Sequence, residues 1–470
     1  MTARASFSVE VSDSGSTWFD AKSLVIRSGR DPAPAAARLG RQFIEINKAA
    51  LSAVGVSART DFDGDAVRVH LTSGTTIGSV PLRSPSSGDV EYGLVVRPRY
   101  GWAGLGPMMA TMGWRITPNV ARLPNLPRSD RRIPAWVLSS IVLARMEAML
   151  RATHRRFAMA EETVSAPRGQ INWTRYASES LVRGRPDAVP CRFPELERDR
   201  SLLAAIHYVL RIHAGSLGSQ RGTGGAAVLS LLTLAEGLLQ QVRDIPPERP
   251  VAGTLRRWLR TGLASESFHD GIEAIGWTAE ERGLGGLADL RGLPWTMSME
   301  TLFEAWVETL ASRISARIGG TVRAGRQLQT LAPLRWDPPF LGSQRYLLPD
   351  VVLERADTTF VFDAKYKTHF EELNASSWFE VEDVIRERHR DDLLQILAYS
   401  TLFQSPKVVC CLIYPCTWNT WESLRDRGRT SHRAGVAAGN RQVDLMLTAV
   451  PMATSPEPLE LLAAELQRGV

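Results

Sequence analysis

The sequence lacks the features that mark secreted, disulfide-rich or membrane-spanning proteins. Only four of its 470 residues are cysteines, and no two of them have the C-x-x-C spacing of a zinc or redox site. The longest apolar stretch, residues 226–239, is interrupted by polar side chains and is too short to cross a bilayer. The opening residues contain no apolar segment like that of a secretory signal. We therefore expect a cytoplasmic protein without membrane association, whose thiols are buried in strands.

Lysine is almost absent from the chain. Only five of the 56 basic residues are lysines, namely Lys22, Lys48, Lys365, Lys367 and Lys407. Two of these five lie within three residues, in the segment Asp363-Ala-Lys365-Tyr-Lys367. Because a site that needs a compact ammonium cannot accept a planar guanidinium, this placement indicates a chemical role for Lys365.

The phosphate-binding pattern G-x-x-x-x-G-K-[S/T] is also absent. The glycine-rich segment at residues 222–225 has no lysine and is typical of a turn. The chain is therefore not expected to hydrolyse a nucleotide itself.

The apolar pattern changes twice along the chain, and its length indicates two or three domains. Residues 1–125 contain short alternating segments, such as 67–71, which predict a mostly-β N-terminal domain, a small barrel or sandwich with short helices. Residues 126–295 have apolar residues at helical spacing and predict a central helical region. Its expected helices span residues 133–155, 200–213 and 226–242, with a glycine-rich linker at 283–292.

Residues 296–470 alternate helix and strand and predict an α/β domain, so the expected fold class is α/β multidomain. The expected helices span residues 299–318 and 383–403, and the expected strands span 347–353, 360–364, 407–414 and 443–450.

The clearest chemical pattern is residues 348–365, where two apolar strands are joined by a polar turn. Asp350 lies near the start of the first strand and Asp363 near the end of the second, and in an antiparallel hairpin these ends adjoin. Asp363 and Lys365 are two residues apart and therefore face the same side. The alternative interpretation is a surface hairpin with a salt bridge between Asp363 and Lys365.

Hydrolysis of a phosphodiester needs a deprotonated water and neutralisation of the charge that builds on the phosphate. A divalent cation does both, and Mg²⁺ typically uses one or two carboxylates plus waters and substrate oxygens. Asp350 and Asp363 are the candidate metal ligands, with the carbonyl of Ala364 as a third. Lys365 is the candidate to orient the water or to offset charge. The expected cofactor is Mg²⁺, with Mn²⁺ as the alternative.

These residues resemble the PD-(D/E)XK nuclease superfamily, and more narrowly the McrC nuclease subunits of McrBC-type restriction systems. Residues 348–353, 362–367 and 392–399 carry this resemblance. A looser similarity to other parts of McrC proteins covers residues 93–102, 105–109, 168–173 and 191–200. The resemblance implies a C-terminal restriction-endonuclease-like domain that cuts double-stranded DNA in antiviral defence.

The resemblance also implies further site residues. Gln395 and Tyr399 fit a Q-x-x-x-Y helix and share one face, where they contact the DNA backbone or brace the site. The alternative is a helix with a mixed polar face. Glu304 fits the first core helix and is a candidate further acid, although acids at four-residue spacing there are also typical of a solvated surface. His389 is interpreted as a surface histidine.

A McrC-like subunit implies a separate motor, a McrB-like AAA+ hexamer that binds GTP or ATP. The regions before residue 296 are then expected to dock on that motor and to stimulate it. The net charge is +6, and residues 97–156 contain eleven arginines opposed only by Asp130 and Glu147. This segment is a candidate surface for DNA or for the motor.

Two other functions remain open from the sequence. One is a non-catalytic adaptor that stimulates an AAA+ motor through a vestigial nuclease fold. The other is a stand-alone DNA repair nuclease, which would cut without any motor or nucleotide.

Overall fold

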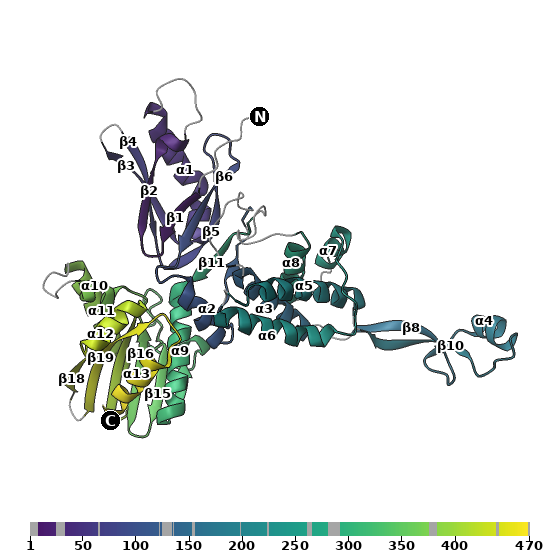
Figure 1. Ribbon diagram of the computed structural model, residues 1–470. Coiled ribbons are helices and arrows are strands. Elements are labelled where there is room, and N and C mark those ends of the chain that lie inside the picture. Colours follow the sequence, from purple (N-terminus) through teal and green to yellow (C-terminus); the bar gives the residue numbers. More distant parts are fainter. Residues whose placement is uncertain are drawn as a thin grey trace. The chain divides into compact units, whose positions relative to one another are not determined.

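The structure, a computed structural model, is a mixed α/β chain with two compact units (Figure 1). Residues 1–135 and 284–470 form one unit, and residues 136–283 form the other. The structure describes residues 8–24, 33–63, 66–121, 123–124, 134, 136–152, 156–197, 199–222, 225–260, 266–280, 292–375, 383–438 and 441–468. Except for residue 292, the predicted glycine-rich linker at 283–292 lies outside the described residues.

The N-terminal part of the first unit has two sheets, in the strand orders β2-β4-β3 and β1-β6-β5-β11-β7. Their strands are β1 (Ser8–Ser12), β2 (Ser16–Asp20), β3 (Val56–Asp63), β4 (Ala66–Ser73), β5 (Thr76–Arg83), β6 (Val90–Arg97), β7 (Asn119–Val120) and β11 (Trp295–Ser298). Alternate residues of β4 are buried, as the sequence predicts for 67–71. A short 3-10 helix, η1 (Ala21–Leu24), follows β2.

Helix α1 (Ala33–Ala53) packs on β3, β4 and β5, so the prediction of only short helices in residues 1–125 is wrong for this segment. Its alanines favour a helix, and it buries Leu39, Phe43 and Leu51 on one face. Helix α2 (Trp102–Thr111) follows β6.

Strand β11 joins the N-terminal sheet to the C-terminal domain. It pairs antiparallel with β5 and β7 and runs directly into α9 (Met299–Ile318). The side chain of Ser298 caps α9 by accepting from the N–H of Thr301. A Cβ on Gly78 would lie 2.2 Å from the carbonyl oxygen of Trp295, so only glycine fits opposite β11. The domain boundary expected between residues 295 and 296 therefore falls inside β11, which is a strand of the N-terminal sheet.

The C-terminal domain is built on a six-stranded mixed sheet in the order β12-β15-β16-β17-β19-β18. The strands are β12 (Thr321–Ala324), β15 (Val351–Arg355), β16 (Thr358–Ala364), β17 (Lys407–Cys416), β18 (Ser431–Ala438) and β19 (Arg441–Pro451). A two-stranded sheet adds β13 (Ala332–Pro333) and β14 (Tyr346–Leu347), and η3 spans Gly325–Gln327. The helices are α9, α10 (His369–Ala375), α11 (Asp383–Ser400), α12 (Trp418–Asp426) and α13 (Pro456–Arg468).

Strand β17 forms the centre of this sheet, parallel to both β16 and β19. Nine of its ten residues are buried, which explains its nearly continuous apolar sequence. Helix α9 packs on β12, β15 and β16, whereas α11 packs on β16 and β17. The predicted helix at 299–318 is confirmed, and all four cysteines are buried, as expected.

The second unit contains α3 (Trp136–Ala152), α5 (Arg200–Ser219), α6 (Gly225–Val242), α7 (Ala252–Leu259) and α8 (Glu266–Ala279). The expected helices at 200–213 and 226–242 lie within α5 and α6. Helix α6 is long and apolar enough to cross a membrane by length and composition alone. It packs on α3 and α5, and a core helix of this kind passes the same test.

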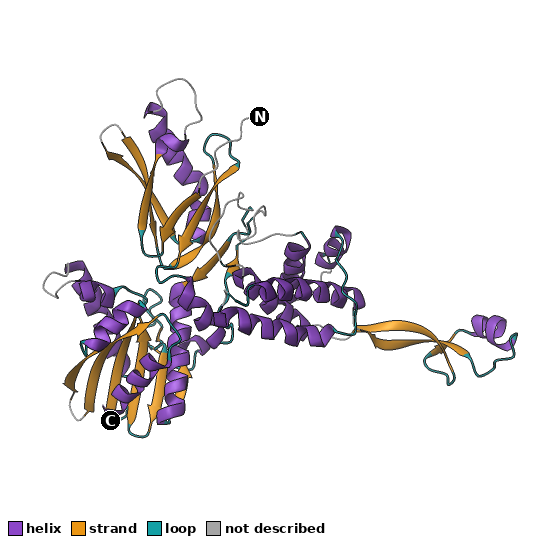
Figure 2. Cartoon of the chain, in the orientation of Figure 1, coloured by secondary structure: helices purple, strands orange, loops and turns teal. Residues whose placement is uncertain are grey.

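The middle region is not wholly helical, in contrast to the sequence prediction. Strands β8 (Arg156–Val164) and β10 (Val189–Glu197) form an antiparallel ribbon, joined at one edge by β9 (Gln170–Ile171). Figure 2 shows this ribbon extending from the helices of its unit, with α4 (Trp173–Arg175) and η2 (Tyr176–Leu181) near its tip. The sequence pattern does not predict the pairing of β8 with β10, because a long stretch of chain separates the two strands.

Candidate active site

The structure brings Asp350 and Asp363 together at adjacent strand ends. Strands β15 and β16 are antiparallel, with Val351 opposite Phe362, so the residue before β15 neighbours the end of β16. The N–H of Ala364 donates to Oδ2 of Asp350 at 2.8 Å. Asp363 is only 1% exposed, which does not fit the alternative of a surface hairpin. Metal binding by these residues stays a prediction.

Lys365 lies directly after β16, and its N–H donates to the carbonyl oxygen of Ile413 at 2.8 Å. Its Nζ lies 2.8 Å from Oδ2 of Asp363 and donates to Oε1 of Gln395 at 2.8 Å. In turn, Nε2 of Gln395 donates to the hydroxyl of Tyr399 at 2.8 Å. Helix α11 therefore holds the ammonium of Lys365 through the predicted Q-x-x-x-Y pair.

Negative charge at the site is only partly balanced. Burial, and then the neighbouring charge of Asp363, raise the pKa of Asp350. Burial also raises the pKa of Asp363, although the ammonium of Lys365 opposes this shift. Burial alone would lower the pKa of Lys365, but Asp363 and the other nearby carboxylates outweigh burial and raise that pKa. A buried and a half-buried carboxylate beside one such ammonium favour the uptake of a proton or a cation.

The oxygen atoms of Asp350, Asp363 and the Ala364 carbonyl are of the kind that Mg²⁺ binds. Oδ2 of Asp363 is buried and accepts no hydrogen bond of good geometry in the described part of the chain, although Lys365 is its ion-pair partner. Among the described residues, no group of three or more His, Cys, Asp or Glu side chains could hold a metal ion. Mg²⁺ does not need such a group, because it commonly keeps waters and uses one or two carboxylates.

Glu304 on α9 is half-buried and lies within electrostatic reach of the two aspartates. Burial raises the pKa of Glu304, and although Arg326 opposes this, the charge of Asp363 raises it further. The structure thus places Glu304 near the site, where its role as a further acid stays a prediction.

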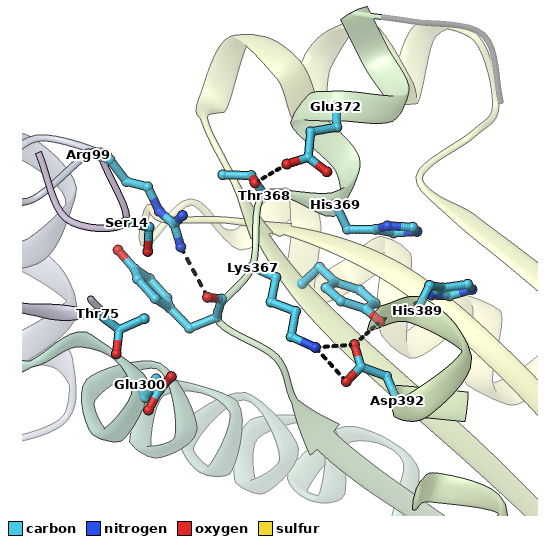
Figure 3. A pocket seen from close by; sticks show the side chains of 12 residues that line it. Ser14, Thr75, Arg99, Glu300, Lys367, Thr368, His369, Glu372, His389 and Asp392 are labelled. Carbon is cyan, nitrogen blue, oxygen red and sulfur yellow. Dashed lines mark hydrogen bonds and ion pairs between the residues drawn. The ribbon is translucent and has the colours of Figure 1, made fainter. Parts of the chain in front are cut away.

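Beside this site, a cavity of about 380 Å³ contains a polar network that the sequence did not reveal (Figure 3). Nζ of Lys367 lies 2.7 and 2.9 Å from the two carboxylate oxygens of Asp392, which is 5% exposed. The hydroxyl of Tyr414 donates to Asp392 at 3.0 Å. Lys367 is therefore fixed by an ion pair to α11, as Lys365 is fixed by Gln395.

Two imidazoles lie beside this network. The rings of His369 and His389 stack with centroids 4.5 Å apart. Burial and the neighbouring ring lower the pKa of His369 to about 4, and burial lowers the pKa of His389. Both shifts favour the neutral imidazole. His389, interpreted from the sequence as a surface histidine, is half-buried and lines the cavity.

Many arginines of residues 97–156 form ion pairs within the chain. The pairs are Arg97–Glu10, Arg99–Asp13, Arg115–Glu308, Arg145 with Asp270 and Glu273, and Arg151–Glu147. Glu308 is 7% exposed, so the acidic face of α9 is not uniformly solvated. The arginines at 122, 128, 131, 132 and 155 lie outside the described residues. The arginines of these pairs balance acids of the same chain, which reduces the net positive charge that they present to DNA.

Comparison with known proteins gives one family match. The family model for the McrBC 5-methylcytosine restriction system component matches residues 102–415. No curated protein matches the chain.

Two solved structures are similar at low identity. One is a half-complex from the tetradecameric assembly of Thermococcus gammatolerans McrB AAA+ hexamers with bound McrC. It is 13% identical, has a TM-score of 0.40, and the match covers 98% of this chain and 100% of that one. The other is the Thermococcus gammatolerans McrBC complex, 13% identical with a TM-score of 0.27, covering 65% of this chain and 88% of that one. Both scores are too low to support an argument about this chain.

Proposed function

Because the chain belongs to the family of McrBC 5-methylcytosine restriction system components, we propose that it is the endonuclease subunit of such a system. It is a Mg²⁺-dependent enzyme with a PD-(D/E)XK domain at residues 296–470, and it hydrolyses the phosphodiesters of double-stranded DNA. The observation that supports this most is the convergence of Asp350, Asp363 and Lys365 around one strand end.

In this proposal, Asp350, Asp363 and the carbonyl of Ala364 hold the ion. A bound Mg²⁺ would act as a Lewis acid toward the phosphate and lower the pKa of the attacking water. Lys365, held by Asp363 and Gln395, places a fixed positive charge where negative charge builds on the phosphate. Such a preorganised charge costs no rearrangement during the reaction, because its hydrogen bonds already exist.

The proposal includes a partner. The sequence has no nucleotide-binding loop of its own, so a McrB-like AAA+ hexamer supplies GTP or ATP hydrolysis. The second unit is the candidate docking region, since the large apolar side chains of Trp173 and Val182 near its ribbon tip are 67% and 79% exposed.

Plasmid cleavage with Mg²⁺, nucleotide and the partner tests the function. Asp363→Ala is expected to lower the cleavage rate by about 10²-fold or more. Asp357→Ala is the matched control, because Asp357 is exposed in the turn of the same hairpin. Equal cutting by wild type and Asp363→Ala would refute the assignment.

The same assay separates the two alternatives. Stimulation of the partner's nucleotide hydrolysis without any cleavage by wild type would favour the adaptor. Cleavage that needs neither motor nor nucleotide would favour the stand-alone nuclease.

A further inference from the structure

The catalytic strand end is held by a residue of the N-terminal β region. Nη2 of Arg99 donates to the carbonyl oxygen of Tyr366 at 3.1 Å, a bond marked in Figure 3 between residues 267 positions apart. The guanidinium carbon of Arg99 also lies 4.3 Å from the centroid of the Tyr366 ring. Tyr366 directly follows Lys365, so Arg99 contacts the backbone next to the candidate catalytic ammonium.

Arg99 is itself fixed. Its Nε lies 3.4 Å from Oδ2 of Asp13, whose side chain is fully buried, and its N–H donates to Oδ1 of the same carboxylate. The Arg99 side chain is 13% exposed. The adjacent Tyr100 packs edge-on against the Tyr366 ring at 5.9 Å and donates its hydroxyl to the carbonyl oxygen of Pro415 at 3.2 Å. Asp13 therefore fixes Arg99 at one end of its contact with Tyr366, and Tyr100 packs against the Tyr366 ring at the other end.

The turn that Arg99 contacts, residues 365–367, is formed by two backbone hydrogen bonds. Where the chain leaves β16, the N–H of Lys365 donates to Ile413 and the N–H of Lys367 donates back to the carbonyl oxygen of Lys365, both at 2.8 Å. This tight turn at Tyr366 directs Lys365 toward Asp363 and Lys367 toward Asp392. A shift of the Tyr366 carbonyl would move both ammonium groups.

We infer that Arg99 is a positioning residue of the nuclease site, which holds the turn at Tyr366 and through it the ammonium of Lys365. The inference rests on the proposed function for its catalytic consequence. The hydrogen-bond geometry of the turn is independent of that function. Since misplacement of a reacting group by about 1 Å can cost 10²-fold in rate, even a partial release of this turn is measurable.

The test uses the full chain with Arg99→Met, which keeps the apolar stem and removes every donor. Arg97→Met is the matched control, because Arg97 is two residues earlier and pairs with Glu10. Hydrogen exchange is measured on peptides that span residues 363–368 and, for comparison, 407–416. The expected result is about 10-fold faster exchange at residues 365–367 only in Arg99→Met, and about 10-fold lower kcat with unchanged KM for DNA.

Arg99→Met also leaves the carboxylate of Asp13 buried without the guanidinium that balances its charge, which could prevent folding. The double variant Asp13→Asn with Arg99→Met removes both charges together and is measured in the same way. Unchanged exchange at residues 365–367 in a folded variant overturns the inference, whether or not the wild type cuts DNA. If exchange is faster in Arg99→Met but the wild type never cuts DNA, the positioning of the turn by Arg99 is supported. Only the proposed function is then refuted.

Discussion

At the scale of single residues, the metal-free site is predicted to destabilise the fold at higher pH. Burial and Asp363 raise the folded-state pKa of Asp350, so the protonated form favours folding. The stability that it contributes is complete below the unfolded pKa of about 3.9 and is lost as the pH rises toward the raised value. Asp350→Asn removes this charge. Without divalent ions, the variant is expected to melt several degrees above wild type at about pH 8 and close to it at about pH 5.

Calorimetry of wild type and Asp350→Asn at the two pH values measures this difference in Tm. The same melts with added Mg²⁺ give a second test. Mg²⁺ at about pH 8 should raise the Tm of wild type and leave that of Asp350→Asn unchanged, because a ligand stabilises only the state that binds it. A variant that melts like wild type at both pH values would show that the pair of aspartates carries no electrostatic penalty.

Gln395 gives a second prediction at this scale. Its Oε1 is the acceptor that holds Nζ of Lys365, so Gln395→Ala is expected to lower kcat about 10-fold while DNA binding is retained. Single-turnover cleavage at saturating DNA measures this. The control is Leu394→Ala, an exposed neighbour on α11. A loss of DNA affinity with unchanged kcat would instead indicate that Gln395 contacts the DNA backbone.

The residues of the site were predictable to the degree that they are local in sequence. Asp350, Asp363 and Lys365 lie within one hairpin, whose two apolar strands, polar turn and strand ends can be worked out from the sequence alone. The ion pair of Lys367 with Asp392 and the contact of Arg99 with Tyr366 join segments 25 and 267 residues apart. No local periodicity encodes such contacts, because they depend on how the elements pack.

At the scale of elements, α2 is predicted to require a glycine. A Cβ on Gly104 would lie 1.8 Å from the carbonyl oxygen of Met452, which follows β19. Gly104→Ala should therefore force this helix away from the C-terminal domain and cost about 1–3 kcal/mol. Gly237→Ala on α6 is the control, since its Cβ meets nothing within 4 Å and is expected to be neutral or stabilising. Urea unfolding of both variants measures the difference, and equal stabilities would contradict the close approach.

Among the elements, the sequence predicts the long ones and misses those that form only by pairing with distant strands. The helices α5, α6 and α9 were predicted because burial of one face imposes a helical period on each sequence, and β17 was predicted from its continuous apolar run. Strand β11 has four residues and takes its strand form from β5 and β7, which lie more than 170 positions earlier in the chain. The β8–β10 ribbon likewise depends on pairing across a long excursion.

At the scale of the whole molecule, the sequence order of the regions differs from their structural grouping, and this predicts which deletions are tolerated. Val120 lies opposite Trp295, and the N–H of Ala121 donates to the carbonyl oxygen of Pro294, so the chain leaves and re-enters the first unit at neighbouring points. Replacing residues 125–292 with a short Gly/Ser linker should therefore keep a folded first unit whose Tm rises with Mg²⁺. A fragment of residues 296–470 should not show this rise, because it lacks most of the sheet that β11 completes and the contact of Arg99 with Tyr366. Thermal melts of both proteins with and without Mg²⁺ decide the matter. An equal response of the 296–470 fragment would mean that the C-terminal domain forms its metal site alone.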